Sequence, residues 1–320
     1  MAATILLDTD PGGDDSVALL WLHSLARQRR LSLAAVTAAD GNVPAQQTYA
    51  NVGQLLSLLG TSVPVGMGVL VAGAKDAAYI HGPDGMGNLS KTLPPSGLVG
   101  KAADSDDLIV AQLTAQPHKI SLIAIGPLTN LAAAEEKHPG VLALAKEIVV
   151  MGGAIAHPGN VTPHAEFNIW FNPEAATKVF RSCNNTVLIP LDVTSQLQFT
   201  HAMAQQIAQA NPHSPISQFI LALCSVMTTT ASSYRETDGS AFLVHDAATL
   251  AYVVYPHLFA FQRAHITIET QGEFTRGQTL LDMRPGPKAP ANAWVATNVD
   301  VGAFFACLLE DLQQLVQDKG

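Results

Sequence analysis

Residues 3–28 read ATILLDTDPGGDDSVALLWLHSLARQ, and they carry the clearest signal of the fold class. The apolar run at 3–8 predicts a strand, a Pro-Gly-Gly turn follows it, and the remainder has the apolar spacing of a helix. The same alternation of apolar strand and helix recurs further along the chain. Strands that are apolar throughout are typical of sheets covered on both faces. The sequence therefore predicts an open, mostly parallel, doubly wound α/β sheet flanked by helices.

The rest of the chain extends this pattern and then departs from it. Further strand-like runs lie at 31–38, 63–68, 119–125, 147–152 and 186–191. After residue 200 we expect helices at 201–210, 214–235, 245–255 and 303–317, and strands at 264–270, 278–283 and 292–299. Residues 70–102 are irregular and predict a long loop near the strand ends. No linker rich in Gly, Ser or Pro divides the chain, so we expect a single domain over 1–320 with extra C-terminal helices and strands.

Composition excludes several classes of protein. Lysine and arginine number 17 against 26 acidic residues, which argues against non-specific binding of nucleic acid. No uninterrupted apolar stretch of about 18 residues predicts a membrane span, and the N-terminus lacks the basic segment of a signal peptide. The three cysteines are scattered, as in a reduced protein. We therefore expect a cytoplasmic protein with neither nucleic-acid nor membrane partners.

Four aspartates lie within eight positions at the first turn: Asp8, Asp10, Asp14 and Asp15. Asp8 and Asp10 are two positions apart on a strand, so their side chains point to the same face. Acids at the start of a helix are favoured by its dipole, and capping accounts for one or two of the four. Gathering all four needs a compensating cation or a chemical use. Clustered carboxylates suit Ca²⁺ or Mg²⁺ better than zinc.

Three further segments carry polar side chains that suit a binding site. The loop GNVTPHAEFN at 159–168 holds Asn160, Glu166 and Asn168, which could bind sugar hydroxyls or cap a surface turn. In VHDAATLAYVV at 244–254, Asp246 could cap a helix, and the neighbouring histidine, His245, could be structural. His81 lies in IHGPDGMGN at 80–88, and histidine is the side chain best suited to proton transfer near neutrality.

The motifs, taken in order, resemble those of a known family. They are DTDPGGDD (8–15), DGN (40–42), IHGPDGMGN (80–88), IAIGPLTNLA (123–132), VVMGGA (149–154), GNVTPHAEFN (159–168) and VHDAA (244–248). This series resembles the nucleoside hydrolases, specifically the Ca²⁺-dependent, inosine-uridine preferring type. The resemblance implies an open, mostly parallel α/β sheet. It also implies hydrolysis of the N-glycosidic bond of ribonucleosides to ribose and free base.

The resemblance also implies roles for individual residues. The Ca²⁺ ligands would be Asp10, Asp15, Asp246 and the backbone carbonyl of Ile125. Asp10 would also activate the metal-bound water against an oxocarbenium-like transition state. His245 and His81 would act on the leaving base. The residues that resemble substrate contacts are Asp14, Asn42, Met151, Asn160, Glu166, Phe167, Asn168, Tyr234 and Asp246.

Departures from the family pattern leave the preferred base open. Tyr79 stands where several inosine-uridine members have a second histidine, whereas His245 stands where purine-preferring members have tryptophan. His245 therefore favours the inosine-uridine type. The family also implies a homodimer or homotetramer.

Two other functions compete with nucleoside hydrolysis. A haloacid dehalogenase-like, Mg²⁺-dependent phosphatase also begins with a strand ending in D-x-D, but it requires neither the Asp14–Asp15 pair nor the loop at 159–168. A non-catalytic nucleoside or ribose sensor would be expected to lack the catalytic base, yet Asp10 is present.

Overall fold

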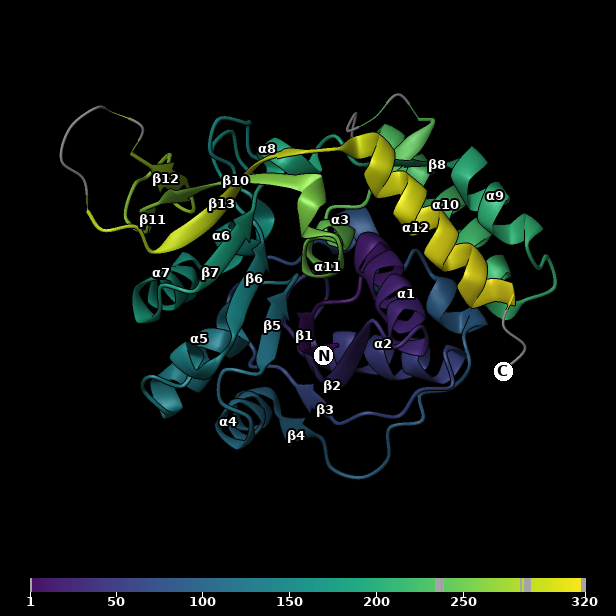
Figure 1. The fold of residues 1–320 in the computed structure, drawn as a ribbon, viewed down its shortest axis with the longest axis horizontal. Helices are drawn as coiled ribbons and strands as arrows, with labels where there is room; N and C mark the ends of the chain where they lie inside the picture. Colours follow the sequence, from purple (N-terminus) through teal and green to yellow (C-terminus); the bar gives the residue numbers. More distant parts are fainter. Residues whose placement is uncertain (1, 234–236, 238, 283, 285–288, 318–320) are drawn as a thin grey trace.

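A nine-stranded sheet forms the centre of the computed structural model, which describes residues 2–233, 237, 239–282, 284 and 289–317 (Figure 1). The strand order is β10-β13-β7-β6-β5-β1-β2-β3-β4. Every neighbouring pair is parallel except β10 with β13, which is antiparallel. The predicted open, mostly parallel sheet is confirmed.

The elements have the following bounds. The strands of the large sheet are β1 (Ala3–Thr9), β2 (Leu31–Ala38), β3 (Val65–Met67), β4 (Ala103–Asp104), β5 (Ile120–Ala124), β6 (Glu147–Met151), β7 (Thr186–Ile189), β10 (Phe259–Ala264) and β13 (Ala293–Val299). Two small sheets pair β8 (Gln198–Thr200) with β9 (Ala241–Leu243), and β11 (Ile266–Ile268) with β12 (Thr279–Leu281). The helices are α1 (Gly13–Arg27), α2 (Ala45–Leu58), α3 (Ala78–His81), α4 (Ser105–Ala115), α5 (Thr129–Lys137), α6 (Phe167–Phe171), α7 (Pro173–Ser182), α8 (Leu191–Thr194), α9 (His201–Gln209), α10 (Pro215–Ser233), α11 (Ala247–Val254) and α12 (Val301–Gln317).

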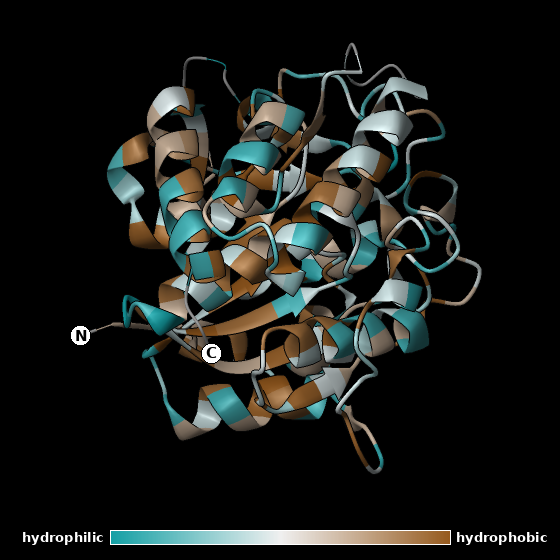
Figure 2. Cartoon of the chain, turned by 90° about the vertical axis from the view of Figure 1, so that its right-hand side faces the viewer, coloured by the Kyte–Doolittle hydropathy of each residue, from teal (hydrophilic) through white to brown (hydrophobic). Residues whose placement is uncertain are grey.

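Helices cover both faces of the sheet, which explains why its strands are apolar throughout. On β1, Ile5 and Leu7 pack into the cluster that includes α1, α11 and α12, whereas Leu6 packs into the cluster beneath α4, α5 and α7. Figure 1 shows these two helix layers on opposite sides of the sheet. In Figure 2 the hydrophobic colour is concentrated in the interior strands, and hydrophilic segments lie on the outer helices.

The sequence located most elements, and two regions differ from its predictions. The strand predicted at 264–270 corresponds to β11, whereas β10, which precedes it in the large sheet, is not predicted. The strand β10 is half-exposed along its length, so it lacks the continuous apolar signal of the central strands. The predicted loop at 70–102 contains the short helix α3 and a 3-10 turn at Leu89–Thr92. The assignment of all of 1–320 to one domain stays a prediction.

Helix α10 is long and apolar enough, by length and composition alone, to cross a membrane. Eight of its residues are buried within the molecule, and the helix packs against α9. Core packing therefore accounts for part of its apolar composition.

Candidate active site

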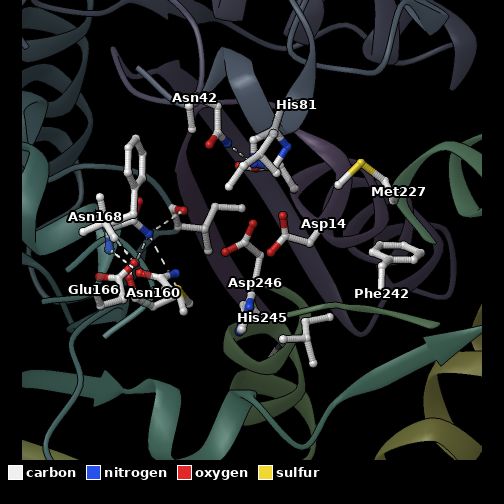
Figure 3. A pocket seen from close by; sticks show the side chains of 18 of the residues that line it. Asp14, Asn42, His81, Asn160, Glu166, Asn168, Met227, Phe242, His245 and Asp246 are labelled. Atoms are coloured by element: carbon white, nitrogen blue, oxygen red, sulfur yellow. Dashed lines mark hydrogen bonds between the residues drawn. The ribbon is translucent and has the colours of Figure 1, made fainter. Parts of the chain in front are cut away.

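The candidate site lies at the carboxyl ends of the central strands. Asp10 follows β1, Asn42 follows β2, Ile125 follows β5 and Met151 ends β6. Parallel strands bring these positions to one edge, and β1 is paired with β2 on one side and β5 on the other. Ligands of open α/β sheets bind at such a switch point. Asp246 enters the same pocket from the start of α11 (Figure 3).

Acidic side chains gather at the centre of this pocket. Asp14, Asp15 and Asp246 each place a carboxylate oxygen within 4.8 Å of the others. Figure 3 shows Asp14 and Asp246 side by side. Burial raises the pKa of Asp246 well above its usual value, and the charges of Asp14 and Asp15 raise it further. The pKa of Asp14 rises to about 7, first because of burial and then because of Asp15. These carboxylates resist full ionisation unless a positive charge joins them.

Asp10 lies next to this cluster, 1% exposed. Its Oδ2 accepts the Asn42 backbone N–H at 2.8 Å, whereas its Oδ1 has no hydrogen-bond partner in the described part of the chain. A Cβ on Gly126 would lie 2.6 Å from Oδ1, so only glycine leaves room for this carboxylate. Burial, and next the charge of Asp15, raise the pKa of Asp10 well above its usual value. The fold thus keeps an unpaired carboxylate oxygen inside the molecule.

Helix capping explains the position of Asp15 but not that of Asp246. Asp15 accepts the Gly12 N–H at 3.0 Å at the start of α1, and also the Thr9 hydroxyl at 2.6 Å. Asp246 occupies the N-cap position of α11, yet its side chain makes no capping hydrogen bond. It is directed instead toward Asp14 (Figure 3). The alternative interpretation, in which the Asp246 side chain caps its helix, is therefore not supported.

The donor atoms at this point fit a divalent metal ion. They are carboxylate oxygens, of the kind that Ca²⁺ and Mg²⁺ prefer. The Ile125 carbonyl, predicted as a further ligand, accepts the Asn168 amide N–H at 3.1 Å, which fixes its orientation. The Asp10 Oδ1 atom is buried without a partner. A buried acidic cluster suited to a metal ion is therefore present.

The predicted sugar-binding loop lies on one side of the acids (Figure 3). Glu166 caps α6, since its carboxylate accepts the backbone N–H groups of Asn168 at 2.8 Å and Ile169 at 3.1 Å. Its Oε2 also accepts the Gly153 N–H at 2.9 Å. Asn160 accepts the Phe167 N–H at 2.9 Å. All four predicted contacts of the loop, namely Asn160, Glu166, Phe167 and Asn168, line the pocket. The capped-turn interpretation and the binding interpretation are thus compatible.

The two predicted histidines lie on opposite sides of Asp14 and Asp246 in Figure 3, with His81 above these acids and His245 below them. His81 ends α3, and its Nδ1 accepts the Gly13 N–H at 3.3 Å. His245 Nδ1 lies 2.8 Å from the Thr194 hydroxyl. Burial lowers the pKa of each imidazole to about 4. Both rings are therefore neutral near pH 7 in this structure. Tyr234, the remaining predicted contact, lies outside the described residues.

Comparison with known proteins decides the family. A family model described as "Inosine-uridine preferring nucleoside hydrolase" matches residues 5–306. This chain belongs to that family. The nucleoside hydrolase is 36% identical over 319 residues to "Non-specific ribonucleoside hydrolase RihC" of Escherichia coli K12, covering 98% of this chain and 99% of that protein. It is 35% identical to a Schizosaccharomyces pombe protein named "Uncharacterized protein C1683.06c", with 97% and 99% covered.

Solved structures resemble the nucleoside hydrolase along its whole length. A purine-preferring ribonucleoside hydrolase from Gardnerella vaginalis superimposes with a TM-score of 0.89 at 28% identity, covering 98% of this chain and 99% of that one. A plant nucleoside hydrolase gives 0.88 at 27% identity with the same coverage. The protein is therefore an enzyme that hydrolyses the N-glycosidic bond of ribonucleosides. These comparisons support neither a phosphatase nor a sensor.

The nucleoside hydrolase pocket includes apolar residues that the sequence did not single out. They are Ala77, Ile80, Val161, Met227, Ala231, Phe242 and Leu243. Met227 and Ala231 are four positions apart on α10, a spacing that reads equally well as core packing. Figure 3 shows Met227 and Phe242 beyond Asp14, opposite the Asn160 loop. An apolar wall facing a polar one suits a ligand with a flat base and a hydroxylated sugar.

Proposed function

We propose that this nucleoside hydrolase uses its acidic cluster to hold one Ca²⁺ ion and uses Asp10 to activate the attacking water. Asp10, Asp15, Asp246 and the Ile125 carbonyl would hold the ion. When bound, it would orient a water molecule and lower the pKa of that water. The buried Asp10 Oδ1, which has no partner in the described structure, is the observation that carries the proposal.

Different residues of the chain would then carry out different parts of the hydrolysis. Asp10 accepts a proton from the water as the water oxygen bonds to ribose C1′ and the C1′–N bond breaks. Positive charge develops at C1′, and the buried carboxylates around Asp14 stabilise it. His245 and His81 line the pocket. We infer that they act on the departing base by donating a hydrogen bond or a proton to it. The predicted ribose contacts, with Met151 and Phe167 packing beside them, are Asp14, Asn42, Asn160, Glu166, Asn168 and Asp246.

We further infer that inosine and uridine are the favoured substrates and that the enzyme is a cytoplasmic homodimer or homotetramer. His245 supports the substrate preference, because it occupies the position that distinguishes the inosine-uridine type. The scattered cysteines and the N-terminal sequence support the location, whereas the family resemblance alone supports the oligomer. Light scattering after size exclusion would test the oligomeric state.

A substrate panel tests the proposed function. Ribose release would be measured with inosine, guanosine, adenosine, uridine and cytidine, before and after chelation and after Ca²⁺ is restored. We expect turnover of inosine and uridine that falls on chelation and returns with Ca²⁺. p-Nitrophenyl phosphate, assayed with Mg²⁺, should not be hydrolysed. Undiminished turnover by the fully chelated enzyme would overturn the metal-dependent mechanism.

A further inference from the structure

The short helix α8 contacts the active site through a threonine that has no assigned role. Thr194 is fully buried, and its Oγ1 lies 2.8 Å from Nδ1 of His245. In the described part of the structure, the Thr194 hydroxyl has no other hydrogen-bond partner. The two residues are 51 positions apart, so no local motif links them.

The surroundings hold Thr194 in place. Leu191 N–H donates to the Gly153 carbonyl at 2.9 Å, which ties α8 to the end of β6. The neighbouring Asp192 accepts the N–H groups of Ile155 and Ala156 at 2.9 and 2.8 Å. Helix α8 is therefore tied to the segment that leads into the loop at 159–168, which carries predicted ribose contacts. A hydroxyl on such a support can fix the ring that it contacts.

Hydrogen-bond counting favours one direction for the Thr194–His245 contact. A hydroxyl carries one hydrogen, and a neutral imidazole carries its proton on either Nδ1 or Nε2. If Thr194 accepted from Nδ1–H, its own hydrogen would be buried without an acceptor among the described residues. If Thr194 donates to Nδ1, its hydrogen is satisfied and the imidazole proton lies on Nε2. The hydrogen left over in the second arrangement is Nε2–H of His245, a partly exposed residue that lines the pocket, where water or the substrate can accept it, whereas Thr194 is fully buried.

We propose that Thr194 is a positioning residue: its hydroxyl donates to His245 Nδ1 and so keeps an N–H at Nε2 for the departing base. The inference rests on the proposed role of His245 on the leaving base. His245 lines the pocket together with Met227 and Phe242. As the C1′–N bond breaks, its electron pair passes to the base nitrogen, and a hydrogen bond from Nε2–H stabilises that charge. Thr194 itself forms and breaks no covalent bond.

Leaving-group dependence tests this role. Thr194→Val removes the hydroxyl at nearly constant volume, and Thr194→Ser retains it. With inosine, we expect kcat of the valine variant to fall about 10-fold or more. With p-nitrophenyl riboside, whose leaving group needs no proton, kcat should change little. The serine variant should restore most of the inosine rate. Thr186→Val is the matched control, because Thr186 is equally buried and its hydroxyl contacts Cys183 Sγ.

The outcomes distinguish a failure of the role proposed for Thr194 from a failure of the role proposed for His245. Equal losses on both substrates in Thr194→Val, combined with a selective inosine loss in His245→Ala, would overturn the role of Thr194 alone. Equal losses on both substrates in His245→Ala would overturn the proposed role of His245 and, with it, that of Thr194. No loss in Thr194→Val would also overturn the inference.

A spectroscopic measurement needs no turnover. The ¹⁵N shifts of His245, assigned by comparison with His245→Ala, report which ring nitrogen carries the proton. We expect the Nε2-protonated tautomer in the wild-type enzyme and a larger Nδ1-protonated fraction in Thr194→Val. A wild-type ring protonated on Nδ1 would contradict the proposal.

Discussion

Buried carboxylates lie at both ends of α1, but the protein supplies hydrogen-bond donors to them in different measure. Near its C-terminal end, the helix contacts Asp311, which is 2% exposed. The Asp311 carboxylate accepts Trp21 Nε1–H and Tyr255 O–H, each at 2.7 Å, and Gln28 Nε2–H at 2.9 Å. Arg30 lies 3.8 Å from it. The protein itself supplies donors and a positive charge, so this acid is a structural group.

At the N-terminal end of α1 the acids face one another. Asp14 and Asp15 lie beside Asp246, and Asp10 Oδ1 is unpaired among the described residues. The described residues that line this pocket include no lysine or arginine. A buried charge without a partner destabilises the fold. The fold therefore supplies hydrogen-bond partners for Asp311 from its own residues, whereas the acidic cluster is left for a ligand.

The largest effect is expected from Asp10→Asn. This change removes the proposed general base, so kcat for inosine should fall by about 10²–10⁴-fold. In metal-free protein the unfolding temperature should stay equal or rise, because one charge leaves a repelling cluster. Ribose release and calorimetry with a chelator measure the two quantities. Wild-type turnover by this variant would contradict the assigned role.

The opposite result is expected at the other end of α1. Asp311→Ala leaves the indole and phenol donors buried without their acceptor, so the free energy of unfolding should fall by about 3 kcal/mol. Urea denaturation measures it. Glu310→Ala is the control, because this neighbouring acid is exposed and should change stability by less than about 0.5 kcal/mol. If both variants lowered the free energy of unfolding equally, Asp311 would not be a structural group of the kind described above.

Ca²⁺ should stabilise the folded enzyme only through the acidic cluster at the N-terminal end of α1. Binding to the native state at 100 times the dissociation constant adds about 2.7 kcal/mol to the free energy of unfolding. We expect this gain in the wild type and in Asp311→Asn, and a much smaller gain in Asp246→Asn. Thermal unfolding at fixed Ca²⁺ and with a chelator measures it. A full gain in Asp246→Asn would exclude that residue as a ligand.

The smallest effect concerns a single donor to Asp311. Tyr255→Phe removes the phenol hydroxyl, whereas Trp21, Gln28 and Arg30 remain. The free energy of unfolding should therefore fall by about 1 kcal/mol. Inosine turnover per folded molecule should not change. If this loss matched that of Asp311→Ala, the carboxylate would depend on one donor rather than on the whole set.

The same contrast separates what the sequence predicts from what it does not. Continuous apolar runs locate the central strands, because burial on both faces leaves no polar positions. The acids of the first turn are conspicuous because four like charges are adjacent in sequence. Asp311 gives no such signal, since its partner Trp21 is 290 positions away and reads as an ordinary apolar residue of a helix.

Contacts distant in sequence also limit prediction of the site. Asn168 orients the Ile125 carbonyl, and Thr194 contacts His245, through hydrogen bonds that no local spacing encodes. Met227 and Phe242 show the apolar pattern of any core residue, so their place in the pocket depends on tertiary packing. Motifs therefore point to the polar residues of the pocket and to Ile125, Met151 and Phe167, whereas the apolar residues contributed by α10 and β9 carry no such signal.

Titration of metal-free enzyme with Ca²⁺ by isothermal calorimetry measures whether the acidic cluster binds the ion. We expect one ion bound per chain in the wild type and in Asp311→Asn, and greatly weakened binding in Asp15→Asn. Absence of binding to the folded wild-type enzyme, or unchanged binding in Asp15→Asn, would contradict the proposed Ca²⁺ site.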